Sequence, residues 1–322
     1  MHFGPFLLVV GHFFTDYRHL RHHFHSTVTI YLSYLCNDMK RTLLLIAALV
    51  CLAFTSTAVE KGEVRFTQRD VERFDEVMEA VAADRDLPMD ELIVRVAKQF
   101  LGTPYVSGTL EQEPERLTVN LRETDCILFV EMCLALALTA KDDDPSFDSY
   151  IDRLAELRYR DGVVDGYTSR LHYTSEWIAQ GSDNGLFKEV TRECGGSPLA
   201  QKFSFMSTHP SSYKQLSNSP ANVAKIRSVE QELQSRSYWY IPKAALPGCA
   251  KNIRTGDIIA FTSTVGGLDI AHIGIAYWQG GTLTFIHAST TADKVIINPT
   301  PLTQYINGVK SQSGVRVIRL NP

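Results

Sequence analysis

The sequence predicts an α+β fold in which helices from the first half of the chain pack on an antiparallel sheet formed by the second half. Helical apolar spacing dominates residues 67–157, whereas short strand-like segments follow one another from residue 256 to the C-terminus. Helices followed by a run of strands are typical of this class. The composition agrees with a folded globular protein, because 44% of the 322 residues are hydrophobic and 21% are charged.

The start of the chain carries segments that are not expected to belong to the fold. Residues 39–58 combine two basic residues, an apolar stretch and small residues at the end, which is the pattern of a secretory signal peptide. Because a signal peptide starts near its own methionine, residues 1–38 are interpreted as mistranslated upstream sequence. We therefore expect an exported bacterial protein, periplasmic or secreted. It would have a single domain over residues 59–322 with a decorating insertion at about 158–246.

Charge and hydropathy exclude two classes of partner. The formal net charge of -4 provides no basic surface for a polyanion, so we expect no nucleic-acid partner. The apolar stretch of the signal is too short to span a bilayer comfortably, and no other stretch approaches that length. We therefore expect no stable membrane insertion once the signal has been removed.

Two helices and a loop are expected ahead of the most informative segment. Residues 67–83 show helical apolar spacing, and Thr67 and Asp70 are placed like the two partners of a capping box. A second helix is expected over residues 89–102, closed by its final glycine. The loop that follows presents Tyr105.

The helix predicted for residues 126–140 is apolar on nearly every face and has one reactive end. Thr124 or Asp125 can cap it, which places Cys126 in the first turn. The unpaired N–H groups and the helix dipole favour a thiolate there, so the pKa of the Cys126 thiol is expected to be lowered. Cys133 lies two turns further on and is expected to be a buried apolar residue.

A hairpin near the C-terminus is expected to bring two histidines together. A two-residue turn at 280–281 makes His272 and His287 diagonal neighbours on one face, about 7 to 8 Å apart at their Cα atoms. The same face carries Gly274 and Ala276, which are small enough for a helix end to approach. A nucleophilic cysteine needs a base and a group that orients the base, and this pair supplies both.

Several motifs follow one another in a fixed order. Asp-Cys stands at a helix start, GDII at residues 256–259, HIGI begins at His272, and FIHAS surrounds His287. This order resembles the NlpC family of papain-like cell-wall hydrolases. The fuller motifs TDCILFVE, SRLHYTSEWI (169–178) and GLDIAHIGIA (267–276) are similar to the branch described as N-acetylmuramoyl-L-alanine amidase-like.

The resemblance implies a papain-like core in which the cysteine helix packs on the antiparallel sheet. It implies that Cys126 is the nucleophile, His272 the base and His287 the polar third member of the site. The substrate-binding residues expected from the same motifs are Tyr105, Asp125, Ile127, Arg170 and Tyr173. The expected substrates are peptidoglycan fragments (muropeptides), and neither a cofactor nor a metal is expected.

One position separates two possible substrates. Family endopeptidases that bind a free L-alanine amine typically carry Asp-Cys-Ser, whereas Ile127 follows Cys126 here. An apolar side chain cannot hydrogen-bond an ammonium group, and leaving that charge without partners is costly. We therefore expect cleavage of the N-acetylmuramoyl-L-alanine amide, with anhydro-muropeptides as substrates that fit this branch. The alternative is a γ-D-glutamyl-diaminopimelate endopeptidase.

Three functions of other kinds are alternatives. A zinc-dependent amidase would use His172, Glu176 and His209 with the strand histidines, and the first two are one helical turn apart. No His-Glu-x-x-His motif supports it. A catalytically silent wall-binding module would not need the cysteine and both histidines. An acyltransferase on the same core would be expected to show an apolar lipid-binding segment, and none is evident.

Overall fold

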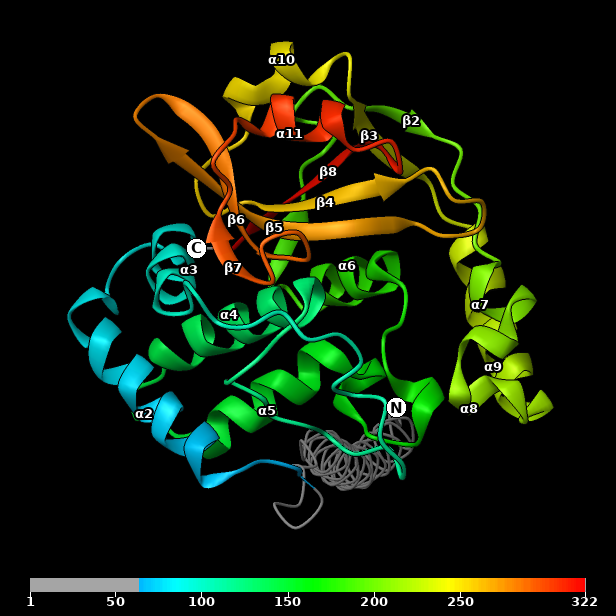
Figure 1. Ribbon diagram of the computed structural model, residues 1–322, viewed down its shortest axis with the longest axis horizontal. Helices are drawn as coiled ribbons and strands as arrows, with labels where there is room; N and C mark the ends of the chain where they lie inside the picture. The colour runs from blue at the N-terminus through cyan, green and yellow to red at the C-terminus, as the bar shows by residue number, and fades with distance from the viewer. Residues whose placement is uncertain (1–63, 322) are drawn as a thin grey trace, which may run out of the picture. The chain divides into compact units, whose positions relative to one another are not determined.

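Helices α2 to α6 lie together below the sheet in the view of Figure 1. The computed structural model describes residues 64–321, which belong to one compact unit, Val59–Pro322. The predicted signal peptide and upstream segment, residues 1–58, lie outside the described residues. The helices are α2 (Gln68–Val81), α3 (Met89–Gln99), α4 (Cys126–Ala140), α5 (Phe147–Arg158) and α6 (Thr174–Asp183).

The predicted helix starts are confirmed where local chemistry sets them, whereas α3 ends at Gln99, three residues before the predicted Gly102. At the start of α2, the Thr67 backbone N–H donates to Asp70 Oδ2 at 2.8 Å, completing the predicted capping box. After α3, Gly102 has φ +88, a conformation that glycine adopts without the penalty other residues face. The third helix, α4, begins at Cys126 with Asp125 as its N-cap.

The sheet has eight strands in the described part of the chain, and its strand pairings are antiparallel as predicted. The order is β2-β3-β8-β4-β5-β6-β7, with β1 also paired to β8. The strands are β1 (Phe187–Glu189), β2 (Ser197–Leu199), β3 (Tyr238–Pro242), β4 (Ile258–Ser263), β5 (Ile270–Gln279), β6 (Thr282–Ser289), β7 (Lys294–Ile297) and β8 (Gln312–Leu320).

The segment predicted as a decorating insertion, 158–246, contributes to the sheet itself. It supplies β1 and β3, which both pair with β8, and β2, which pairs with β3. It also supplies α6, whose Trp177 is buried in the main core.

The other helical elements are η2 (Ala82–Asp84), η3 (Arg160–Gly162), η4 (Tyr167–Ser169), α7 (Phe205–Thr208), η5 (Pro210–Ser212), α8 (Lys214–Ser217), α9 (Pro220–Gln234), α10 (Leu246–Cys249), η6 (Ala250–Asn252) and α11 (Leu302–Gly308).

The two faces of the sheet are covered by different elements. Below it, α4 packs on β5 and β6 through an apolar cluster that includes Ile273, Ile275 and Ile286. Above it lie α10 and α11, and a second cluster joins them to the opposite strand faces through residues such as Phe285. Burial of both faces explains why the central strands read as nearly continuous apolar runs.

The apolar character of α4 follows from its place between the sheet and the other helices. Its residues from Leu128 to Ala137 are all buried, including one acid, Glu131. Arg158 at the end of α5 neutralises that acid, since its Nε donates to Glu131 Oε2 at 2.8 Å. A buried charge is tolerated when it is paired in this way. None of the helices within residues 64–321 is long and apolar enough to cross a membrane.

Candidate active site

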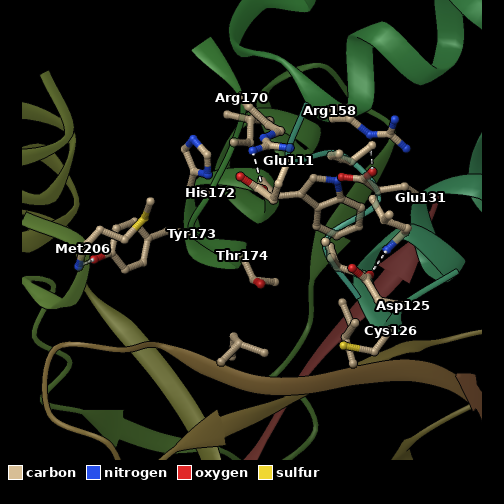
Figure 2. A pocket seen from close by; sticks show the side chains of 18 of the residues that line it. Glu111, Asp125, Cys126, Glu131, Arg158, Arg170, His172, Tyr173, Thr174 and Met206 are labelled. Carbon is tan, nitrogen blue, oxygen red and sulfur yellow. Dashed lines mark hydrogen bonds and ion pairs between the residues drawn. The ribbon is translucent and has the colours of Figure 1, made fainter. Parts of the chain in front are cut away.

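A cavity of about 300 Å³ opens at the N-terminal end of α4. Figure 2 shows its walls, which come from the loop at 108–111, the start of α4, the segment 167–174 and the beginning of β5. Six of the eight predicted site residues line it: Asp125, Cys126, Ile127, Arg170, Tyr173 and His272. Tyr105 and His287 do not line it.

The helix start places Cys126 at this cavity. Asp125 has extended backbone angles, and its Oδ1 accepts a hydrogen bond from the Leu128 backbone N–H at 2.9 Å. Asp125 is therefore the cap, while the Thr124 hydroxyl donates to the Asp125 carbonyl at 3.1 Å. The cysteine that follows is the first residue of the helix.

The expected lowering of the Cys126 pKa is wrong. The residue keeps some exposure at the cavity, but its thiol is surrounded by protein, and this burial raises its pKa to about 12. The charge of Asp125 raises it further, because a second negative charge beside a carboxylate is unfavourable. Backbone N–H groups of Ile273, Ile127 and Cys126 favour the thiolate, but burial outweighs them. The thiol is therefore protonated at neutral pH in the free protein.

The predicted pairing of the two histidines is confirmed. The register Gln279↔Thr282 to Ile275↔Ile286 matches the expected hairpin, and His272 Nε2 lies 2.7 Å from His287 Nδ1. Burial lowers the pKa of His272 to about 4. Burial and the neighbouring imidazole lower that of His287 to about 3. Both rings are therefore neutral near pH 7.

Neighbouring side chains fill the histidine face at Gly274 and Ala276. A Cβ at Gly274 would meet the Phe285 ring at 2.9 Å, and Ala276 packs in the cluster above the sheet. The helix α4 lies on the other face. Cys126 meets β5 near the start of the strand, where the N–H of Ile273, next to His272, favours the thiolate.

A polar residue that the sequence did not predict, Asn298, lies beside the histidines. In the β6–β7 register His287 faces Ile296, so Asn298 lies on the same face as its diagonal neighbour. His287 Nε2 is buried without a partner of good hydrogen-bond geometry among the described residues. The Asn298 side chain is nevertheless close enough to favour protonation of His287 and so raise its pKa. The sequence could have indicated Asn298, because residues 296 and 298 lie on one face of the strand that pairs with the His287 strand.

The wall opposite Cys126 is built from charged and aromatic residues. Arg170 Nη2 donates to Glu111 Oε1 at 2.8 Å, and its guanidinium lies 5.0 Å from the centre of the Tyr167 ring. The hydroxyl of Tyr173 donates to Glu230 Oε1 at 2.7 Å, so this group is already used. Arg170 and Tyr173 therefore line the cavity, and their partners hold them in position.

Tyr105 and Ile127 flank the helix start. Tyr105 forms an isolated bridge with Thr124, two residues before the cysteine, and does not line the cavity. Burial, together with the proximity of Cys126 and Asp125, raises the Tyr105 pKa to about 12, so its hydroxyl stays protonated close to the thiol. Ile127 lines the cavity directly beside Cys126.

The residues named for a zinc site are engaged elsewhere. His172 Nε2 lies 2.8 Å from the Tyr167 carbonyl oxygen, and Glu176 accepts from Arg160 at 2.6 Å. Within residues 64–321, no group of three or more His, Cys, Asp or Glu side chains is placed to hold a metal ion. The structure does not bring the proposed ligands together.

Comparison with known proteins identifies the family. The model of the AmiA-like family, described as N-acetylmuramoyl-L-alanine amidase-like, matches residues 95–315. The chain belongs to this family of amidase-like peptidoglycan hydrolases. The comparison does not identify the NlpC family itself, so the papain-like core stays a prediction. No curated protein matches the chain.

Solved structures agree with this assignment. An N-acetylmuramoyl-L-alanine amidase from Bacteroides uniformis is 41% identical, with 73% of this chain and 99% of that chain covered and a TM-score of 0.69. A protein from Bacteroides fragilis described as a candidate xylanase is 42% identical over 70% and 99%, with a TM-score of 0.67. A Legionella pneumophila protein at 20% identity, covering 80% and 97% with a TM-score of 0.59, shares the fold. Since two neighbours of similar identity have different enzyme names, the choice of substrate depends on this chain's own site.

Proposed function

We propose that this protein is a cysteine-dependent amidase that hydrolyses the N-acetylmuramoyl-L-alanine bond of muropeptides. The observation that carries the proposal is the shared cavity: Cys126 at the start of α4 and His272, hydrogen-bonded to His287, both border it. This is the arrangement of nucleophile, base and orienting group that acyl transfer requires. The amidase-like family and the amidase from Bacteroides uniformis support the choice of bond.

The tautomers of the two histidines assign the base. If His272 Nε2–H donates to His287 Nδ1, then His272 Nδ1 is left free to accept a proton. His287, being neutral, then carries its own proton on Nε2, the nitrogen that does not contact His272. Since the thiol and both rings are neutral at rest, the proton leaves Cys126 as the sulfur attacks.

The reaction then follows acyl-transfer chemistry in two steps. The sulfur of Cys126 bonds to the lactyl carbonyl carbon, and backbone N–H groups at the start of α4 stabilise the oxyanion. His272 gives the proton to the L-alanine nitrogen, the C–N bond breaks, and a thioester with the sugar remains. Water then attacks the thioester with His272 as base, which releases the sugar with a free lactyl carboxylate.

The walls beside the sulfur favour an acylated L-alanine nitrogen over a free amine. Ile127 presents no hydrogen-bonding group there. The nearest carboxylate, Asp125, accepts the Leu128 N–H and caps the helix. A charged ammonium would therefore lie beside an apolar side chain with little compensation, which is costly. We extend the proposal to anhydro-muropeptides as substrates and to an exported protein, periplasmic or secreted, that meets them outside the cytoplasm.

Mass analysis of the products tests the proposal. The purified protein is incubated with anhydro-muropeptides, with and without a chelator. We expect a free peptide that begins with L-alanine, together with a sugar that ends in a lactyl carboxylate, and no effect of the chelator. A sugar that retains L-Ala-D-Glu would instead show the endopeptidase activity. Loss of turnover with the chelator alone would contradict the thiol mechanism.

A further inference from the structure

A smaller cavity lies next to the candidate active site. Its volume is about 230 Å³, and Thr109 lines both cavities, so the two adjoin at this residue. The other walls come from the segment before α2 and from the chain that leads into α4. Its lining residues include Arg65, Asn120, Arg122 and Glu123.

Two polar atoms at this cavity lack hydrogen-bond partners among residues 64–321. Arg65 uses Nη2 to donate to the Pro114 carbonyl oxygen at 2.6 Å, while its Nη1 is buried with no hydrogen-bond partner. The Thr109 hydroxyl is likewise buried without one. An unpaired buried donor costs free energy, more so when it is charged. A ligand that accepts from a guanidinium and a hydroxyl would remove that cost.

Arg65 differs from the other arginines near the site. Arg170 pairs with Glu111, and Arg158 pairs with Glu131. Arg122 uses its Nε for Asp70 at 3.1 Å. In the part of the chain that the structure describes, Arg65 has no carboxylate within ion-pair distance.

The charges of the cavity favour an anion at its Arg65 end. Arg122 is neutralised by Asp70, although its terminal N–H groups remain available. Glu123 adds a negative charge, and its Oε1 accepts from Asn120 at 3.2 Å. An anionic group is therefore favoured between Arg65 and Thr109, away from Glu123.

The smaller cavity suits a group close to the scissile bond, because Thr109 lines both this cavity and the one that Cys126 borders. In a stem peptide the second residue is a D-glutamate linked through its side chain, and its α-carboxylate is free. This group is the first anion along the chain after the L-alanine nitrogen.

We propose that the cavity between Arg65 and Thr109 binds the α-carboxylate of the stem-peptide D-glutamate. The inference rests on the proposed function, because it takes a muropeptide as the substrate. Arg65 and Thr109 would then hold the leaving peptide while Cys126 acts on its amide. The site distinguishes acidic stem peptides from peptides in which this carboxylate is amidated.

The test uses binding rather than turnover. The full chain with Cys126→Ala is titrated calorimetrically with two muropeptides that differ only in carrying D-glutamate or D-isoglutamine at this position. We expect the acid to bind about tenfold more tightly than the amide, as for a hydrogen bond to a charged group. Adding Arg65→Ala should remove the difference, and Thr109→Val should reduce it.

Arg69→Ala is the matched control. This arginine lies on α2, is 53% exposed and pairs with Glu72 and Glu76, so its loss removes one positive charge without touching the cavity. It should leave the preference for the acid unchanged. Equal affinity for acid and amide, absence of binding, or a preference that survives Arg65→Ala would overturn the inference. Because no bond is cleaved in this experiment, its result is independent of the product analysis that tests the amidase function.

Discussion

The two faces of the β5–β6 hairpin are built for different purposes. The face toward α4 is apolar and fully packed, with Ile273, Ile275 and Ile286 against the helix. The opposite face carries His272 and His287, with aromatic rings around them and Asn298 beside them. Cys126 and His272 both line the cavity at the N-terminal end of α4. The packed face fixes the geometry, and the polar face holds the groups that move protons.

The largest effect is expected from loss of the Cys126 thiol. We expect Cys126→Ala and Cys126→Ser to lower turnover of a muropeptide by about 10⁴-fold or more, because the nucleophile is lost. The unfolding midpoint should stay close to that of the unchanged protein, since the residue lies at the helix end. Turnover and denaturant unfolding of the same preparations measure both effects.

Cys133→Ala is the control on the packed side of the same helix. Cys133 is fully buried, so its truncation should destabilise the protein by about 1 kcal/mol while turnover is kept. Activity that survives in Cys126→Ala, or is lost in Cys133→Ala at unchanged stability, would show that the roles of the two thiols have been misassigned.

The second largest effect is expected at His272. His272→Ala should reduce turnover about 10²- to 10⁴-fold, the usual range for loss of a general base.

Alkylation of Cys126 by iodoacetamide at pH 7 should be slow in the unchanged protein, because burial raises the thiol pKa to about 12. Rapid alkylation with a plateau down to pH 5 would instead reveal a preformed thiolate-imidazolium pair and contradict the neutral resting state.

The sequence predicted the parts of the site that local rules determine. Asp125 is a cap because of its place before an apolar run, and the histidine pair follows from counting residues back from a Gly-Gly turn. The thiol pKa was mispredicted because burial depends on the whole fold. Asn298 was missed because its role depends on the β6–β7 register.

The same distinction applies to the fold. The long strands β5 and β6 show clear periodicity, whereas β1, with three residues from Phe187 to Glu189, is defined by its pairing with β8. Residues so distant in sequence leave no local signal of their contact. Arg65 is similar, since only the folded chain shows that Thr109 lies at the same cavity and that Arg65 has no acidic partner.

Acid should lower the free energy of unfolding through His287. Burial lowers the pKa of His287 to about 3, whereas an unfolded chain titrates near 6.5. The unfolded state therefore binds more protons between these values, and stability present above pH 6.5 is lost as pH falls toward 3. At pH 5 this one residue should cost about 2 kcal/mol relative to pH 7, at 1.36 kcal/mol per unit. Urea unfolding of the unchanged protein and His287→Asn at both pH values isolates the contribution; an equal loss in both proteins would contradict it.

The smallest effect is expected at Asn298, which lies beside His287 on the polar face. Asn298→Leu removes the oxygen that we expect to accept His287 Nε2–H, so His287 loses the preference that keeps its Nδ1 as the acceptor for His272. Turnover should fall about tenfold with KM unchanged, the value of one hydrogen bond. Asn298→Asp should restore most of it, because a carboxylate also accepts that proton. The ¹⁵N shifts of His287 report the tautomer directly, which a purely structural role would leave unchanged. Thr300→Val is the control. Asn298 Nδ2 donates to the Thr300 hydroxyl at 3.0 Å, so loss of that hydroxyl loosens the strand end but keeps the Asn298 oxygen that accepts from His287. If Asn298→Leu keeps both the turnover and the tautomer of His287, the polar face ends at His287 and the asparagine serves only to anchor the strand.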